Sequence, residues 1–510
     1  MSDDQIGERL YRFPGGLKLR HHKKIACSEP LAPVPLPSHL YLPWSAGRAQ
    51  AGELLVEPGE RVLRGQPLTR PDNDFEIAVH APTSGHIGDW VERPTAWPPG
   101  ETVRCLELVA DGQDEAAALA PLDDWQTVDR DRLVDHLRAS GLAGLGGALF
   151  PTAAKLRGDW PEIETLILNG AECEPWIACD EMLMRSDPER VVSGAQVLAR
   201  AAGAKMIVIA IEDQMGVVEK RLTAACQAAS GPIVIRVVKV TTIYPEGGER
   251  QLIQVLTGKE VPHDGLPQDL GLLCHNVATA AAAHDAVIDG QPLIERIVTV
   301  SGPGIRQPRN LIARIGTPIA DLIAAAGGLE DNVQRLVLGG PMSGTALAGD
   351  QIAVTKGTNS LLALTADQLV DQQPTLPCIN CGECVRVCPA SLLPQLLYKA
   401  IAGEQNEQAA ELNLFDCIEC GCCAQICPSH IPLVDWYRHG KAERRLQQLD
   451  ERRAALSRRR FEAREQRLAS EQAERQARRE RRREKLDQAG QAQSEIQAAI
   501  ERAKQRKSDN

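Results

Sequence analysis

Eight of the fifteen cysteines in this 510-residue chain fall into two sets with the same internal spacing. The first set is Cys378, Cys381, Cys384 and Cys388, and the second is Cys417, Cys420, Cys423 and Cys427, each set followed directly by a proline. Every member of the second set lies 39 residues after its counterpart, so the pattern is an internal repeat. Three thiolates at i, i+3 and i+6 can wrap one corner of a metal cluster. This stretch is therefore constrained to fold around metal.

The spacing favours two [4Fe–4S] clusters over zinc. Zinc also binds four thiolates, but zinc ribbons usually supply two separated cysteine pairs. In two-cluster ferredoxins the cysteine before proline reaches the opposite cluster. We therefore predict cluster one on Cys378, Cys381, Cys384 and Cys427, and cluster two on Cys417, Cys420, Cys423 and Cys388. Cys422 is predicted to be a packed neighbour, and the small buried cysteines are expected to be Cys27, Cys105, Cys226 and Cys274.

Length and composition bound the rest of the chain. A chain of this length is expected to form roughly three or four domains. With 43% apolar and 25% charged residues, it is neither wholly disordered nor fibrous. No apolar run of about 18 residues predicts a membrane span, and residues 1–5 do not resemble an export signal. Because the chain is Arg-rich from about Lys441 onward yet has a net charge of -11, its remainder is more acidic still, which argues against nucleic-acid binding.

The sequence predicts a multidomain α/β protein. Residues 1–110 show short segments broken by Pro58-Gly59 and Gly65, a pattern that resembles the lipoyl barrel-sandwich fold. The stretch from Asp72 to Val79 lacks the carrier lysine of that fold, so a structural module is expected. The further units are an α/β domain at 125–290, a unit at 295–350 that resembles the soluble-ligand-binding β-grasp, a two-cluster ferredoxin domain at 365–440, and a charged tail at 441–510 that is helical or disordered.

A glycine-rich loop, from Gly141 to Lys155, has the chemistry of a phosphate cradle. Gly144, Gly146 and Gly147 allow backbone amides to approach an anion, and Lys155 supplies a positive charge. It is not a dinucleotide fingerprint, because Leu149 stands where glycine is required and the loop follows a helical pattern instead of a strand. Taken alone, such a loop is as consistent with a tight structural turn as with a binding site.

Three other polar segments accompany this loop. They are Asn169-Gly-Ala-Glu172-Cys-Glu174, Tyr244-Pro-Glu-Gly247-Gly-Glu249, and His275-Asn276. The first follows an apolar strand, which puts its polar groups where α/β sheets bind ligands.

In order and register, the four segments resemble the flavin- and NADH-binding subunit of respiratory complex I. The resemblance implies an FMN site in which Phe150 stacks on NADH and Glu249 lies beside the nicotinamide. The implied cofactor contacts are Gly144, Gly146, Gly147, Phe150, Lys155, Asn169, Glu172, Glu174, Gly247, Glu249 and Asn276. The chain departs from that family at Leu149, Ala171 and Gly248.

The order of all the units resembles the family of C subunits of the Rnf (Rsx) complex. That resemblance implies a peripheral subunit on the cytoplasmic side of a bacterial inner membrane. It implies an NAD:ferredoxin oxidoreductase with FMN and two [4Fe–4S] clusters. The expected partners are NADH, a ferredoxin-like subunit, and integral and peripheral subunits that move ions. Two alternatives remain open from the residues: a non-enzymatic iron–sulfur adaptor and a soluble flavin diaphorase subunit.

Overall fold

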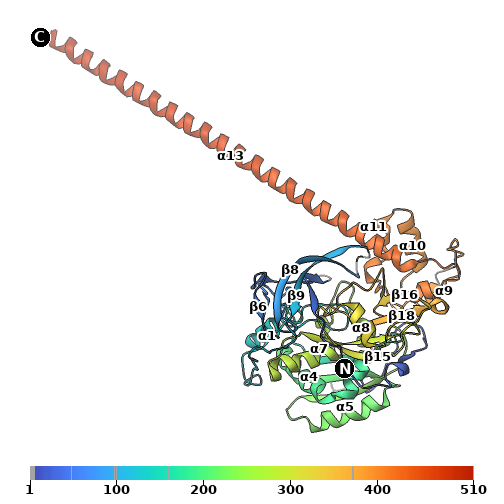
Figure 1. Ribbon diagram of the computed structural model, residues 1–510. Helices are drawn as coiled ribbons and strands as arrows, with labels where there is room; N and C mark the ends of the chain where they lie inside the picture. Colours follow the sequence, from blue (N-terminus) through green and yellow to red (C-terminus); the bar gives the residue numbers. More distant parts are fainter. Residues whose placement is uncertain are drawn as a thin grey trace.

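The computed structural model describes residues 6–46, 49–96, 98, 100–158, 160–369 and 373–508, with only the backbone of Ala46, Ala49 and Ser508. Residues 1–5 lie outside the described residues, so the prediction that they form no export signal stays a prediction. One long helix projects from a body of packed modules (Figure 1). Within the described ranges, no helix combines the length and hydropathy that crossing a bilayer requires.

A four-stranded parallel sheet forms the centre of the α/β unit. Its order is β12 (Val234–Val240), β11 (Met206–Glu212), β10 (Thr165–Gly170) and β13 (Leu272–Asn276). Every residue of β11 is buried, as expected for a central strand whose two faces are both covered. One apolar core lies on each face of the sheet. The helices of this unit are α1 (Arg130–Ala139), α2 (Thr152–Leu156), α3 (Cys179–Ser186), α4 (Pro188–Ala202), α5 (Gly216–Ala228), α6 (Glu249–Thr257) and α7 (Val277–His284).

Local sequence signals fix both ends of α4. The Asp187 side chain accepts a hydrogen bond from the Arg190 amide, and Pro188 occupies the first turn. Gly203 ends the helix in the left-handed conformation at φ 77°. The helix then leads directly into β11, so capping chemistry sets the spacing between two neighbouring strands.

The barrel-sandwich and β-grasp modules share one hydrophobic core, which contains Leu40 and Leu108 of the first and Val298 and Leu311 of the second. The sandwich strands are β2 (His39–Pro43), β9 (Thr102–Ala110), β8 (Gly85–Pro94) and β6 (Arg61–Val62), with the ribbons β3 (Ser45–Ala46) to β4 (Ala49–Gln50) and β5 (Glu53–Leu54) to β7 (Thr69–Arg70). The β-grasp sheet runs β1 (Ala32–Pro33), β15 (Arg309–Arg314), β14 (Glu295–Ser301), β18 (Ser360–Thr365), β16 (Val333–Leu338) and β17 (Thr345–Leu347), with helix α8 (Ile319–Ala325). Strands β1 and β18 lie outside the range 295–350 expected for this unit.

Residues 6–31 form a strap along other modules and take no part in the sandwich, so the expected unit 1–110 includes residues that pack elsewhere. The Tyr11 amide donates to the Val255 carbonyl of α6 at 2.9 Å. The Gly16 amide donates to the Val387 carbonyl in the cysteine-rich region at 3.0 Å. This N-terminal strap carries few apolar residues at regular spacing, which is why the sequence pattern did not distinguish it from the sandwich.

The cysteine-rich module is a structural repeat as well as a sequence repeat. Helix α9 (Glu383–Arg386) and helix α12 (Cys422–Gln425) are offset by 39 residues. The residues that precede them have matching left-handed backbones, with φ 78° at Gly382 and φ 79° at Gly421. Helices α10 (Pro394–Ala402) and α11 (Asn406–Glu411) lie between the two halves. The two halves and the start of the last helix bury one core.

The last helix, α13, runs from Leu433 to Ser508 and begins inside the cysteine-rich module, earlier than the tail boundary expected at 441. Tyr437 is buried there, and the Lys441 ammonium donates to the Cys417 carbonyl at 2.6 Å. Beyond this module the helix is exposed on all sides (Figure 1). At a rise of 1.5 Å per residue, its 76 residues extend roughly 110 Å.

Candidate functional site

Three of the four polar segments meet at the carboxyl edge of the parallel sheet. Asn169 and Asn276 end the neighbouring strands β10 and β13 and are paired in register. The Asn276 side-chain amide lies 3.5 Å from the Asn169 carbonyl, and the Asn169 side-chain amide donates to the Gly247 carbonyl at 2.7 Å. An added Cβ at Gly247 would lie 2.2 Å from the Ala171 carbonyl oxygen, so only glycine allows these loops to approach so closely.

The glycine-rich loop lies against the same edge. A Cβ added at Gly146 would lie 3.4 Å from the Cβ of Asn276, whereas Gly147 faces open space at φ 102°. The Leu145 amide donates to the Thr279 hydroxyl at 3.0 Å, which fixes the loop to the start of α7. Leu149 adopts a left-handed backbone at φ 52°, which explains why glycine is the less strained residue there. Its side chain is buried beside Ile77.

Lys155 brings the positive charge of the loop to this edge. Its ammonium lies 2.5 Å from a carboxylate oxygen of Glu249 and 2.6 Å from the carbonyl of Cys274, in the middle of β13. The two side chains are 19% and 40% exposed, so both remain within reach of a ligand. Lys155 and Glu249 are 94 residues apart in the sequence, and the structure brings their side chains together.

Phe150 lies at the exposed end of the loop, 44% exposed. It makes an edge-to-face contact with Phe75 of the barrel-sandwich, with ring centroids 6.3 Å apart. Phe75 belongs to the hairpin that carries the lysine in lipoyl domains, and Asp74 beside it pairs with Arg157 at 2.9 Å. The hairpin without a carrier lysine is thus docked beside the glycine-rich loop. Sequence reasoning missed Phe75, and its only signal is an aromatic residue at the tip of a polar hairpin.

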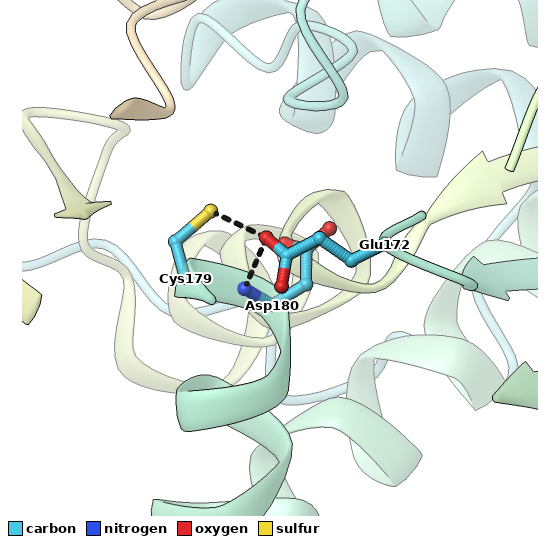
Figure 2. A group of neighbouring side chains, drawn as sticks. All are labelled: Glu172, Cys179 and Asp180. Carbon is cyan, nitrogen blue, oxygen red and sulfur yellow. Dashed lines mark hydrogen bonds between the residues drawn. The ribbon is translucent and has the colours of Figure 1, made fainter. Parts of the chain in front are cut away.

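Glu172 caps the start of helix α3. One carboxylate oxygen accepts hydrogen bonds from the Cys179 thiol and the Asp180 amide, each at 3.2 Å, as Figure 2 shows. Burial, opposed by the nearby Lys23, raises the pKa of Glu172 to about 7. The Asp180 carboxylate in turn accepts from the Asn276 side chain at 2.6 Å. Through Asp180, Glu172 therefore helps to hold the Asn276 side chain in place beside the glycine-rich loop.

Lys23 of the N-terminal strap is buried and places a positive charge beside Glu172. Its ammonium lies 3.3 Å from the Glu212 carboxylate and 3.7 Å from that of Glu172, and it donates to the Glu172 carbonyl. Although burial opposes its charge, the Glu172 and Glu212 carboxylates raise the pKa of Lys23. The sequence offers no signal for Lys23, since it is one of several basic residues in an irregular stretch.

Glu174 lies outside the cradle, although the resemblance implies a cofactor contact. Its carboxylate accepts hydrogen bonds from the Ser343 amide at 2.9 Å and the Met342 amide at 3.2 Å. Gly340 is close enough that an added Cβ would lie 2.2 Å from the Glu174 carboxylate. The residue therefore connects the α/β unit with the β-grasp. Its burial there raises its pKa.

The eight cysteines gather into two groups of four. Cys378, Cys381, Cys384 and Cys427 line one cavity. The pKa of Cys423 is raised by burial and then by the nearby thiolates of Cys417, Cys420 and Cys388. In each group, the cysteine that precedes proline comes from the other half of the repeat; that each group binds one cluster stays a prediction. Cys422 is fully buried outside both groups, and Cys105 and Cys274 are also buried. Cys27 and Cys226 are only partly buried, which differs from the expectation for these two.

Both candidate sites fit the groups that the sequence implies. The glycine-rich loop leaves open space at Gly147 beside an asparagine amide and a lysine, which suits a phosphorylated, hydrogen-bonding planar ligand such as FMN. Two groups of four thiols, each formed from both halves of the repeat, suit two cubane clusters.

Models of four families match the chain. The Nuo51 FMN-binding domain matches residues 137–285, and the RnfC barrel sandwich hybrid domain matches residues 11–113. The SLBB domain matches residues 297–346, and the 4Fe-4S dicluster domain matches residues 371–428. These matches establish a multidomain chain with an FMN-binding-type domain and a 4Fe-4S-type domain.

Relatives that align over most of the chain decide the family. The C subunit of the ion-translocating oxidoreductase complex of Yersinia pestis is 42% identical over 464 residues, covering 91% of this chain and 74% of the relative. The chain belongs to the family of C subunits of ion-translocating oxidoreductase complexes. Subunits of the same name from Pseudomonas aeruginosa and Cronobacter sakazakii are 44% and 41% identical, covering 90% and 99% of this chain.

This member of the C-subunit family spans only part of the length of these relatives. It spans 59% of the Pseudomonas aeruginosa protein and 64% of the Cronobacter sakazakii protein. Among solved structures, an NAD+-reducing [NiFe]-hydrogenase in the H2-reduced state is 20% identical, covers 60% of this chain and 61% of its own, and gives a TM-score of 0.43. That likeness is too slight to carry a conclusion.

Proposed function

We propose that this chain is the electron-transfer module of an ion-translocating NAD:ferredoxin oxidoreductase, with one FMN and two [4Fe–4S] clusters. The observation that carries the proposal is the meeting of the glycine-rich loop, both asparagines and the Lys155–Glu249 pair at one edge of the sheet. Eight thiols in two crossed groups belong to the same chain. The family to which the chain belongs supports an electron-transfer role.

The proposed FMN contacts come from four segments. Lys155 would pair with the phosphate, and the amides of the loop from Gly144 to Gly147 would surround it. Asn169 and Asn276 would donate to the ring system from the strand ends, where α/β sheets bind ligands. Bound FMN would supply the ability to accept electrons as a hydride and to release them singly. The thiol sets would bind cubane clusters, which carry one electron at a time.

The proposed nicotinamide nucleotide site lies at the exposed end of the loop. Phe150 and Phe75 form an edge-to-face pair, and both are exposed enough to contact a planar ring. Glu249, which pairs with Lys155, would supply the acidic group beside the nicotinamide. Glu172 and Glu174, which the resemblance also implies, are here proposed as supporting residues, because they cap α3 and join the β-grasp.

We propose a peripheral position on the cytoplasmic side of the inner membrane, with ion translocation in integral partner subunits and electrons exchanged with a ferredoxin-like subunit. The family name supports membership of an ion-translocating complex. A chain with this role would bind washed membrane vesicles that contain the partner subunits and would leave them at high salt. A soluble diaphorase would stay in solution under all conditions.

Reconstitution tests the cofactor content. The whole chain is supplied anaerobically with iron, sulfide and FMN, and bound FMN, iron and zinc are measured per mole. We expect one FMN, about eight irons, and loss of the oxidised flavin band on addition of NADH. Iron without flavin would leave the non-enzymatic adaptor as the function, and zinc without iron would refute both.

A further inference from the structure

The loop that bears Gly247 and Glu249 also contacts the cysteine-rich module. Tyr244, at the start of this loop, is buried, and its hydroxyl donates to the Cys420 carbonyl at 2.6 Å. The strap holds the same residue from the other side, because the Leu17 amide donates to the Tyr244 carbonyl at 2.8 Å and the Leu17 carbonyl accepts from the Tyr244 amide. Tyr244 is therefore fixed between the proposed flavin edge and one ligand of cluster two.

Two thiols outside the ligand sets lie in the same contact. The Gly247 amide donates to the Cys173 sulfur at 3.3 Å, which attaches that thiol to the proposed flavin edge. Cys173, Tyr244 and Cys422 form one buried cluster, with Cys420 and Met342 packed against it. Cys422 stands between two ligands of cluster two in the sequence. A continuous set of packed side chains thus joins the flavin edge with this ligand set.

The ligand set of cluster one is the more exposed of the two. Its ligand Cys381 is exposed, and the neighbouring Ile379 is 66% exposed. The ligands of cluster two are more enclosed, since Cys388 and Cys423 are buried. The two ligand sets are therefore unequal although the sequence repeat makes them look equivalent.

We propose that cluster two is the flavin-side cluster, that Tyr244, Cys173 and Cys422 form its contact with the flavin site, and that cluster one faces the external one-electron partner. The inference rests on the proposed function and adds the order of the two clusters. Electrons from bound FMN would reach cluster two one at a time and pass on to cluster one, so the two electrons of one hydride would reduce each cluster once. In the opposite direction the order is reversed.

Matched removal of one cluster at a time tests this order in the whole reconstituted chain. In Cys420→Ala, cluster one remains. We expect dithionite to produce the electron paramagnetic resonance (EPR) signal of cluster one, and we expect NADH to produce no such signal. In Cys381→Ala, cluster two remains, and we expect its signal with either reductant. The reverse pattern, or a cluster-one signal with NADH in Cys420→Ala, would overturn the proposal. Failure of the proposed function is distinguishable, because NADH would then not bleach flavin even in the parent chain.

A milder variant covers the case in which a ligand substitution removes both clusters. Tyr244→Phe keeps the ring and removes the donor to the Cys420 carbonyl. We expect a shift in the reduction potential and EPR spectrum of cluster two, with those of cluster one unchanged. Tyr398→Phe, on the cavity of cluster one, is expected to leave the cluster-two spectrum as it is in the parent. If Tyr244→Phe shifted cluster one, or neither cluster, the assigned contact would be wrong.

Discussion

Replacing Lys23 by methionine should destabilise the α/β unit in a way that depends on pH. The methionine preserves most of the side-chain volume but removes the ammonium that lies 3.3 Å from Glu212 and 3.7 Å from Glu172. All three side chains are less than 10% exposed, so water cannot replace the lost charge. Removing one partner of a buried ion pair typically costs about 3–5 kcal/mol.

The pH dependence follows from Glu172. Burial raises its pKa from 4.5 to about 7 in the parent chain, so its effect on stability is favourable at low pH and is lost as the pH rises through 7. Without Lys23 the pKa rises further, and the carboxyl must stay protonated to remain buried. Above pH 7 the deficit of the variant therefore grows by about 1.4 kcal/mol per pH unit. We expect a total of about 3 kcal/mol at pH 8, and a smaller deficit below pH 6.

Hydrogen exchange of the β10 amides under increasing urea measures the local free energy of unfolding of the α/β unit. A local measurement is needed because a multidomain chain does not unfold in a two-state manner. Lys24→Met is the matched control, because Lys24 is exposed in the same turn. The double variant Lys23→Met/Glu172→Gln should recover part of the lost stability, because the buried Glu212 carboxylate still lacks its partner. A deficit that stayed constant from pH 6 to 9, or a double variant as unstable as the single one, would refute the reasoning.

Three further results are expected. Lys155→Ala should weaken FMN binding roughly ten- to hundredfold, because one charge-assisted hydrogen bond is lost, while the iron content stays at the parent level. FMN fluorescence quenching and iron analysis measure the two cofactors. Equal loss of both cofactors would contradict this prediction. Phe75→Ala should raise the KM for NADH roughly two- to tenfold with little change in kcat; steady-state kinetics decide, and an unchanged KM would remove Phe75 from the site. Leu149→Gly should relieve a left-handed backbone strain of about 1–2 kcal/mol but lose about 2–5 kcal/mol of buried packing. We therefore expect a net destabilisation, measured as urea unfolding of the loop region. A more stable variant would show that the backbone strain dominates.

The sequence predicts best where a local pattern has one physical solution. The ends of α4 follow from Asp187, Pro188 and Gly203, each of which acts within one turn of the helix. The crossed cysteine groups follow from a spacing that few metal sites share. In both cases the information lies within a few residues of the feature.

What the sequence did not predict depends on contacts between distant segments. Glu172 and Glu174 carry the same charge in the same loop, yet one caps α3 and the other binds the β-grasp. Lys23 and Phe75 come from modules outside the α/β unit and have no local pattern. No periodicity rule distinguishes Lys23 and Phe75 from ordinary surface residues, because their partners Glu212 and Phe150 lie more than 70 residues away.

The core shared by the sandwich and the β-grasp has a consequence for synthesis on the ribosome. Leu40 and Leu108 share a core with Leu311 and Leu361, but the whole α/β unit separates the two groups along the chain. The apolar face of the sandwich therefore stays exposed until the β-grasp has been synthesised. The intervening α/β unit has cores of its own and can fold first. A nascent chain stalled before β14 should therefore protect β11 from protease while the sandwich strands are still cleaved.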